Sequence, residues 1–387
     1  MMHNTYKTTV IVFFLTGFFG IGALFAACGC PYQIAGDLYE DCSVNFKDLA
    51  VMAQHWLVDC NITPGNPACL PKWTAEAPMF VGRDQFTGGV INGKIYVFGG
   101  NGNPNQVDLK STEMLDPATD WTNRADNNHN GGNGVEELTG AVVNGKLYVF
   151  GAWGGIGPGG HYGDFNFNEQ YDPNTDSWTT LAPKPTVLTG GPATVYNGEV
   201  YLFGGGYNYD GKDEPNDYNV VEAYNPATNS WRFVTNMPKM VGRPGVATVG
   251  QKAYLIGGYL LDEKRFSGEI MTFDFQTELW DTNSCEPLAA CRIHASVYSS
   301  AAPVVDGKIF LIGGIEGDSA NHGASRKVDI YDTVTNKWQA GPSLPLPLDN
   351  HLSVVLDNKI YVIGGNNVSG YINRAKSEVI SLSLYVE

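Results

Sequence analysis

Basic residues are scarce in this sequence of 387 residues, in which 24 Lys and Arg stand against 40 Asp and Glu. The net charge of −16 argues against nucleic acid or an anionic membrane surface as a partner, because both are negatively charged. The sequence also lacks the G-x-S-x-G motif of a hydrolase nucleophile. With 47 Gly, 21 Pro and 43% hydrophobic residues, the composition instead fits a turn-rich β protein with a core.

The stretch NGKIYVFGG at residues 92–100 recurs five times in altered form. The first glycines of successive Gly-Gly pairs are 52, 53, 53, 56 and 51 residues apart. A period near fifty predicts an array of one repeated supersecondary unit. The copies are NGKLYVFGA (144–152), NGEVYLFGG (197–205), GQKAYLIGG (250–258), DGKIFLIGG (306–314) and DNKIYVIGG (357–365).

Each repeat predicts four strands. The β-branched and aromatic run before the glycine pair indicates a strand, and the Asn-Gly or Asp-Gly before that run indicates a two-residue hairpin turn. A second motif, such as EQYDPNTDSW at 169–178, indicates strand, tight turn and strand. Radial repetition of such four-stranded meanders gives a β-propeller.

These residues resemble the kelch repeat, whose marks are a hydrophobic run ending in Gly-Gly, then a Tyr and then a Trp. The resemblance covers residues 72–387 in six copies and implies an all-β, six-bladed propeller. Two copies depart from the pattern: Ala152 replaces the second glycine in copy two, and Phe310 replaces the strand Tyr in copy five.

Trp73 predicts how the ring closes. It lies 26 residues before Gly99, the same spacing that Trp178 and Trp231 have from the glycine pairs that follow them. We therefore expect the strand at Trp73 to become the outer strand of the last blade, which pairs edges that would otherwise be exposed. This assigns residues 71–387 to the propeller.

Residues 1–27 contain the apolar run TTVIVFFLTGFFGIGALFAA, which predicts an export signal. LFAAC also resembles a bacterial lipoprotein box with Cys28 as the lipid-carrying residue, and ordinary cleavage is the alternative. The protein is therefore expected in the periplasm, at the outer membrane or outside the cell, where disulfides form. We expect Cys285 to pair with Cys291, and the connectivity of the other four is open. The six candidate disulfide residues are Cys30, Cys42, Cys60, Cys69, Cys285 and Cys291.

Residues 28–70 predict a small Cys-rich helical module. DLYEDCSVNFKD at 37–48, followed by an amphipathic stretch, resembles one half of a dockerin-type, EF-hand-like calcium module. Tyr39 departs from the Asn or Asp of that pattern, and a disulfide-stapled cap without metal is the alternative. The resemblance implies Ca²⁺ as the only cofactor, with Asp37, Asp41, Ser43 and Asp48 as its side-chain ligands.

In an up-and-down blade, the long connections after the glycine pairs and between blades lie on one face, which we predict to be the binding face. Loops 152–168 and 206–220 combine aromatic residues with Asp, which suits sugars. Alternatively, these rings pack beneath their own loops. The candidate ligand-binding residues there are Trp153, Tyr162, Asp164, Tyr207, Tyr209 and Asp210.

Polar residues begin the innermost strands and are expected to line the mouth of the central channel. Arginines there could grip a carboxylate with two hydrogen bonds; alternatively, these residues bond loop carbonyls around the axis. The residues are Arg83, Glu137, Arg243, Asn350 and His351.

Two functions are compatible with these features. The first is an exported recognition protein that binds glycans, envelope proteins or extracellular proteins through the long-loop face. The second is a carbohydrate mutarotase or epimerase, because exported kelch proteins that resemble this one include sialic-acid mutarotases. Copper galactose oxidases share this type of propeller, but they need a Tyr-Cys crosslink and a ligand from a further domain, which argues against that activity. The catalytic residues of any enzyme activity cannot be identified from the sequence.

Overall fold

The computed structural model describes residues 72–102, 107–128, 133–156, 161–187, 191–205, 219–281, 302–317, 322–367 and 375–383. The chain divides into two units, Met1–Leu70 and Pro71–Glu387, and all described residues belong to the second. These residues form strands and turns without a helix, so none of them contributes a helix long and apolar enough to cross a bilayer.

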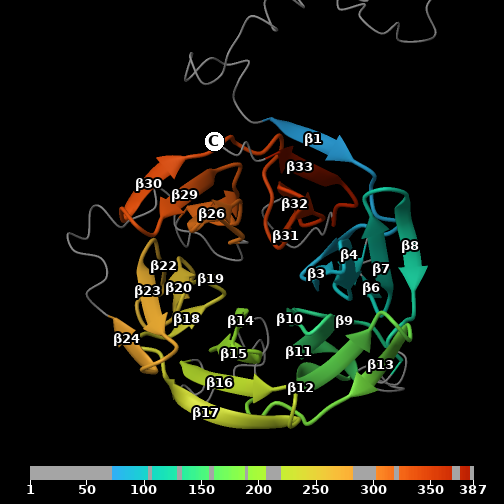
Figure 1. Ribbon diagram of the computed structural model, residues 1–387, viewed down its shortest axis with the longest axis horizontal. Coiled ribbons are helices and arrows are strands. Elements are labelled where there is room, and N and C mark those ends of the chain that lie inside the picture. Colours follow the sequence, from blue (N-terminus) through green and yellow to red (C-terminus); the bar gives the residue numbers. More distant parts are fainter. Residues whose placement is uncertain are drawn as a thin grey trace, which may run out of the picture. The chain divides into compact units, whose positions relative to one another are not determined.

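Six sheets surround a common axis, with one edge of each sheet directed at the centre of the ring (Figure 1). The described structure is therefore the all-β, six-bladed propeller that the repeats predicted. Blades one to three consist of β3 (Thr87–Ile91), β4 (Lys94–Phe98), β7 (Thr112–Asp116) and β8 (Asp120–Arg124); β10 (Thr139–Val143), β11 (Lys146–Ile156), β12 (His161–Asp172) and β13 (Ser177–Thr180); and β14 (Ala193–Tyr196), β15 (Glu199–Phe203), β16 (Val220–Asn225) and β17 (Ser230–Asn236). Blades four to six consist of β19 (Gly245–Val249), β20 (Lys252–Ile256), β23 (Ile270–Asp274) and β24 (Leu279–Asp281); β25 (Val304–Val305), β26 (Lys308–Ile312), β29 (Val328–Asp332) and β30 (Lys337–Ala340); and β31 (Leu352–Leu356), β32 (Lys359–Ile363), β33 (Val379–Ser383) and β1 (Trp73–Glu76).

Several blades have additional short strands. Some lie in the segments that lead into the innermost strands, and the others lie in the connections that follow the glycine pairs. These strands are β2 (Arg83–Asp84), β5 (Asn101–Gly102) and β6 (Val107–Asp108); β9 (Val135–Glu136), which pairs with β11; β18 (Val241–Gly242), β21 (Tyr259–Leu260) and β22 (Arg265–Phe266); and β27 (Ile315–Gly317) with β28 (His322–Ala324).

The hairpin turns between the first two strands of the blades have the predicted left-handed conformation. Asn92 and Gly93 have φ values of 51° and 73°, and the same pair of positive values recurs at Asn144 and Gly145. A side chain is tolerated at the first position because asparagine adopts this conformation more readily than most residues do.

Strand β1 closes the ring in the way that the spacing of Trp73 predicted. It pairs antiparallel with β33, so that the first and last described strands lie side by side (Figure 1). The indole of Trp73 donates a hydrogen bond to the carbonyl of Pro342 at 2.9 Å, in the segment that leads from blade five into blade six. Trp178 and Trp231 make the same bond to the segments that enter their own blades, through Ala125 and Ala182.

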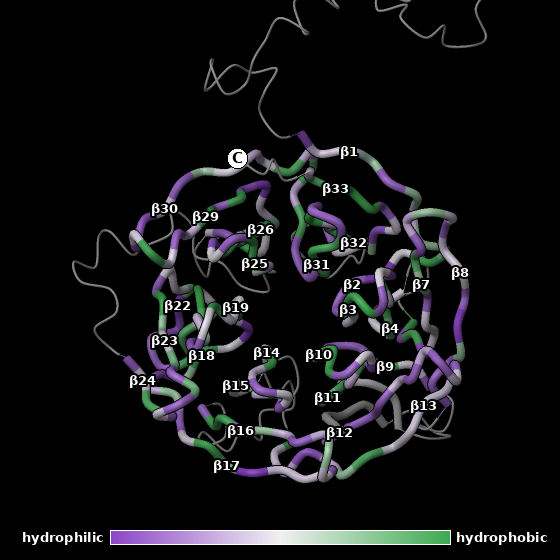
Figure 2. The backbone as a smooth tube through the Cα atoms, viewed as in Figure 1, coloured by the Kyte–Doolittle hydropathy of each residue, from purple (hydrophilic) through white to green (hydrophobic). Residues whose placement is uncertain are grey.

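The core lies between neighbouring blades. Middle strands such as β32 are largely hydrophobic, whereas the outer strand β8 is mostly hydrophilic (Figure 2). Blades one and two meet where the rings of Phe98 and Trp178 approach to 4.2 Å between centroids. The hydrophobic middle strands are thus buried between blades, and the inner ends of the blades are lined by the residues that precede each innermost strand.

Candidate functional site at the axial mouth

One residue in each of four blades has the left-handed conformation two positions before the innermost strand begins. These residues are Gln85, Glu137, Arg243 and Asn350, with φ values of 54°, 55°, 47° and 50°. Each lies 14 positions before the first glycine of its own blade's Gly-Gly or Gly-Ala pair. The repeat therefore places one side chain from each of these four blades at an equivalent position near the axis.

The glycine pair of each blade makes close backbone contact with the segment that precedes the innermost strand, and so holds that segment in place. A side chain at Gly365 would begin 2.6 Å from the carbonyl oxygen of Asp349, and one at Gly100 would begin 2.5 Å from that of Asp84. Both glycines also have positive φ. Only glycine lets the backbones approach this closely. Blade two differs, because Ala152 replaces the second glycine and β11 continues as a strand to Ile156.

A cavity of about 310 Å³ lies where these segments converge, and all six blades contribute to its wall. Among the described residues, blade three contributes Gly191, Pro192 and Ala193, and blade five contributes Ala302 and Pro303. The described polar side chains of the wall come from the other blades. They are Gln85, Glu137, Thr139, Arg243, Asn350, His351 and Ser353.

Glu137 and Arg243 form an ion pair in this cavity. Their side chains are 16% and 11% exposed, so the pair is largely shielded while it still faces the cavity. Blade three lies between the two blades that supply them, and its described residues in the cavity wall are Gly191, Pro192 and Ala193.

His351 of blade six is also part of the cavity wall. Its side chain is only 8% exposed, and neither ring nitrogen has a hydrogen-bond partner among the described residues. Burial lowers the pKa of the imidazole to about 4, so the ring is neutral at pH 7. A neutral imidazole offers one donor and one acceptor.

Two buried carboxyl groups, those of Asp349 and Glu136, directly precede cavity-lining residues in the sequence. Burial raises the pKa of Asp349 to about 7, although Asn350 donates a hydrogen bond to its Oδ1 at 3.0 Å. Burial, and then repulsion from Asp108, raise the pKa of Glu136 to about 8. These groups hold protons near neutral pH, whereas ordinary surface carboxyl groups do not.

The structure places four of the five predicted channel residues together. Glu137, Arg243, Asn350 and His351 all line the cavity.

Arg83 does not. Its side chain is fully buried, and its guanidinium bonds the carbonyls of Gly99 and Ser111 and the carboxylate of Glu113. Arg83 lies 16 rather than 14 residues before its glycine pair, so it belongs to the wall and not to the mouth.

Sequence reasoning missed three polar cavity residues, Gln85, Thr139 and Ser353. The spacing of 14 residues before the glycine pair would have identified Gln85, because Glu137 and Arg243 share it. No comparable signal marks Ser353, whose position depends on how blade six faces its neighbours.

Most of the other predicted site residues lie outside the described part of the chain. Trp153 is half-buried in β11, where its backbone pairs with that of Glu136. Residues 206–218 are outside the description, as are the side chains of residues 155–165. The same holds for all seven cysteines and for the four predicted calcium ligands. Within the described ranges, no group of three or more His, Cys, Asp or Glu side chains is placed to hold a metal ion.

Comparisons with known proteins agree with this architecture. Kelch-like protein terF of Aspergillus terreus is 27% identical over 59% of this chain and 49% of its own length. Kelch repeat and BTB domain-containing protein 12 of Homo sapiens is 28% identical over 44% of this chain and 29% of its own. The chain thus spans half or less of these curated relatives.

Two further proteins are matched over most of their own length. N-acetylneuraminate epimerase 1 of Escherichia coli is 27% identical over 76% of this chain and 87% of its own length. The solved structure of YjhT superimposes with a TM-score of 0.64 at 19% identity, covering 79% of this chain and 96% of that one, which shows a shared fold.

Two family descriptions match the chain itself. The kelch motif matches residues 82–120, within blade one. The Attractin/LZTR1 beta-propeller matches residues 152–386, which is more than half of the sequence. This chain therefore belongs to the Attractin/LZTR1 β-propeller family and carries kelch repeats.

Proposed function

We propose that this protein is a recognition protein that binds a glycan through the long-loop face, with an acidic sugar held in the axial cavity. The observation that carries the proposal is the convergence of equivalent polar residues from four blades on one cavity, including the shielded Glu137–Arg243 pair. Cavities with a few convergent polar groups are the usual sites of small polar ligands.

The chemistry of the cavity favours a carboxylate-bearing sugar. Arg243 is the only cation that lines it among the described residues, and a guanidinium binds a carboxylate through paired hydrogen bonds. A ligand carboxylate can exchange with Glu137 at Arg243, which releases Glu137 to accept hydrogen bonds from sugar hydroxyls. Gln85 and Asn350 supply amide donors and acceptors at neighbouring positions of the rim.

The aromatic loops extend this proposal to larger ligands. Trp153 lies in β11, which continues beyond the glycine position of blade two. Stacking of a sugar on one aromatic ring contributes about 1 kcal/mol, so useful affinity requires several contacts. We therefore propose an oligosaccharide or glycoprotein as the complete partner. The apolar start of the sequence motivates the further hypothesis that the protein meets this partner outside the cytoplasm.

A second candidate is a mutarotase or epimerase acting on a sugar acid. The observation that favours it is the similarity to N-acetylneuraminate epimerase 1, which extends over 87% of that protein. Anomer exchange needs a base to take the proton of the anomeric hydroxyl and an acid to protonate the ring oxygen as the ring C–O bond breaks. Glu137 is the base candidate once a substrate carboxylate occupies Arg243, and the protonated Asp349 or Glu136 is a proton reservoir behind the wall.

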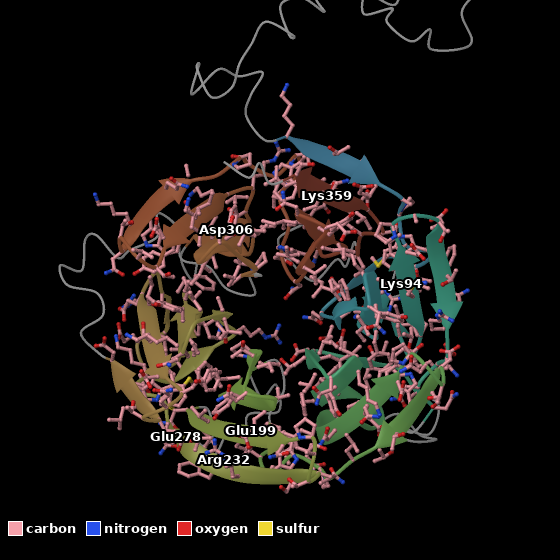
Figure 3. The ribbon with its side chains drawn as sticks, viewed as in Figure 1. Lys94, Glu199, Arg232, Glu278, Asp306 and Lys359 are labelled. Atoms are coloured by element: carbon pink, nitrogen blue, oxygen red, sulfur yellow. The ribbon has the colours of Figure 1, made fainter. Side chains whose placement is uncertain are left out.

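One set of measurements tests both candidates. A glycan array identifies the ligand, and NMR exchange spectroscopy on N-acetylneuraminate measures anomer interconversion. Arg243→Ala should abolish binding of acidic glycans. Arg232→Ala is the matched control, because Arg232 pairs with Glu278 at 2.6 Å toward the outer edge of the ring (Figure 3). Binding without accelerated interconversion supports recognition alone, whereas acceleration that depends on Arg243 supports the enzyme. Equal binding by wild type and Arg243→Ala contradicts both.

A further inference from the structure

Buried acidic residues directly precede the left-handed residues of blades one, two and six at the axial cavity. They are Asp84, Glu136 and Asp349, which are 3%, 7% and 3% exposed. In blade four, the residue at the equivalent position before Arg243 is Gly242. Acidic side chains are rarely this buried, and buried groups that titrate in an unusual range cluster at functional sites. The position behind each cavity-lining residue therefore calls for an explanation in terms of the cavity.

Asp349 is connected to the cavity through its own blade. Nδ2 of Asn350 donates a hydrogen bond to Oδ1 of Asp349 at 3.0 Å, and Asn350 lines the cavity. The backbone of Asp349 exchanges two hydrogen bonds with that of Asn366, at 2.9 and 2.8 Å. These contacts hold Asp349 in its buried position next to a residue of the cavity wall.

Asp349 also interacts with the cation of the cavity. Burial raises the pKa of its carboxyl group to about 7, while the hydrogen bond from Asn350 and the positive charge of Arg243 act in the opposite direction. Arg243 thus interacts with acidic groups of two blades, with Glu137 of blade two as an ion pair and with Asp349 of blade six through its charge. Any group that neutralises Arg243 will therefore change the proton affinity of Asp349.

A second buried acid adjoins the other member of the ion pair. Glu136 directly precedes Glu137, and the charged groups that face it are Asp108, Glu137 and Asp84, while the side chain of Asn101 bonds to it. Asp84 and Asp108 lie opposite Asn101 on the two sides of β5. Burial, with these negative charges, raises the pKa of Glu136 to about 8. More negative charge at the cavity would favour its protonated form further.

A carboxylate ligand at Arg243 would raise the pKa of both acids. It adds a negative charge and engages the positive charge that opposes protonation of Asp349. The complex then binds more protons than the free protein does. By linkage, the affinity is greatest where the acids are already protonated in the free protein, and it falls as the pH rises through about 7 for Asp349 and about 8 for Glu136.

We propose that Asp349, together with Glu136, couples the uptake of protons to the binding of a carboxylate at Arg243. The axial cavity then binds an acidic sugar tightly in mildly acidic or neutral surroundings and releases it in alkaline ones. This inference rests on the proposed function, because it assigns a form of regulation to the same site. Asp349 and Glu136 act through their charge, so the coupling requires no contact between them and the ligand.

The test is calorimetric titration of the full chain with D-glucuronate, D-galacturonate and N-acetylneuraminate. At pH 7.5, titrations in Tris and in triethanolamine, neither of which is an anion, give the number of protons taken up from the difference in binding enthalpy. Wild type should take up about 0.5 to 1 proton per ligand. In bis-Tris propane, its affinity should be about tenfold lower at pH 9 than at pH 6.

Variants assign the protons to the two acids. Asparagine resembles the protonated aspartic acid, so Asp349→Asn should bind the sugar acids about tenfold more tightly than wild type at pH 9 and equally at pH 6. Its proton uptake at pH 7.5 should fall by about half or more. Glu136→Gln should have a smaller effect in the same direction. Glu378→Gln, at a carboxylate that is 55% exposed, is the control and should follow wild type at every pH.

The outcomes separate this inference from the proposed function. Sugar acids that bind wild type without proton uptake, and with equal affinity at pH 6 and pH 9, overturn the coupling and leave the proposed function intact. Proton uptake that is unchanged in Asp349→Asn overturns the role of Asp349 in the same way. If wild type binds none of the three sugar acids at pH 6, the proposed function fails and the coupling fails with it.

Discussion

Arg243 of blade four forms an ion pair with Glu137 of blade two, across the intervening blade three. The pair joins residues 106 positions apart in the sequence, and both belong to the segments that enter innermost strands. It therefore links two blades at the axial cavity, to which blade three contributes Gly191, Pro192 and Ala193 among the described residues.

Glu137 and Arg243 should have a measurable coupling energy in the free energy of unfolding. We predict that Glu137→Gln, Arg243→Ala and the double variant give a coupling energy of about 1–2 kcal/mol in urea unfolding, because both charges are largely shielded from solvent. The outer pair Arg232–Glu278, whose side chains are 39% and 37% exposed, is the control and should couple by less than about 0.5 kcal/mol. Equal coupling in the two pairs would show that the cavity does not strengthen the interaction.

Arg83 should behave as a structural residue. Its guanidinium neutralises Glu113, whose side chain is 1% exposed and otherwise accepts the backbone N–H of Phe80 at 2.9 Å. Arg83→Met would leave a buried, unpaired carboxylate, and we expect a loss of about 3–5 kcal/mol in the free energy of unfolding. Adding Glu113→Gln should recover much of that loss. Ligand binding by the folded fraction should be unchanged, and loss of binding at full stability would restore Arg83 to the ligand site.

Stability should fall as the pH rises through the range in which Glu136 ionises. Its pKa is about 8 in the folded protein, above the ordinary value of 4.5, because of burial and the nearby Asp108. The folded state therefore holds this proton more tightly, and the resulting stabilisation is complete below pH 4.5 and is lost as the pH passes about 8.

Glu136→Gln should remove this dependence. At pH 8.5 the variant should be more stable than wild type by on the order of 1–3 kcal/mol, and the difference should shrink toward pH 5. Thermal unfolding across this range measures it. Glu378→Gln, at a carboxylate that is 55% exposed, is the control and should track wild type. A wild-type curve parallel to that of Glu136→Gln would contradict the raised pKa.

The closure of the ring should depend on β1. Trp73 packs into the core between blades five and six and donates to Pro342, and Glu76 accepts a hydrogen bond from Ser381 at 2.5 Å. We expect Trp73→Ala to cost about 2 kcal/mol, which is less than for a fully buried Trp because Trp73 is only half-buried. Deleting residues 71–80 should lower the melting temperature much further and promote association through the exposed edge of β33. Gel filtration and calorimetry measure both effects, and a deletion variant as stable as wild type would refute closure by this strand.

The repeat architecture could be predicted because its signals are local. A hairpin turn with positive φ at Asn92 and Gly93, a β-branched run and a Trp at fixed spacing each act within a few residues, and their period of about fifty residues counts the blades. Even the closure by Trp73 follows from spacing, since a strand with the repeat Trp but no partners of its own can only complete another blade.

The composition of the site was decided by the tertiary structure. Gln85 faces the axis and Arg83 does not, although the two residues are only two positions apart in the same segment. The direction of that segment is set by its contact with the glycine pair. The Glu137–Arg243 contact depends on the closed ring, which brings residues of blades two and four to the same cavity across blade three. The sequence by itself determined the blades and their order. Only the closure of six blades into a ring determined which side chains meet at the axis. These side chains come from blades far apart in the sequence, and no local sequence pattern of one blade indicates its contacts with another.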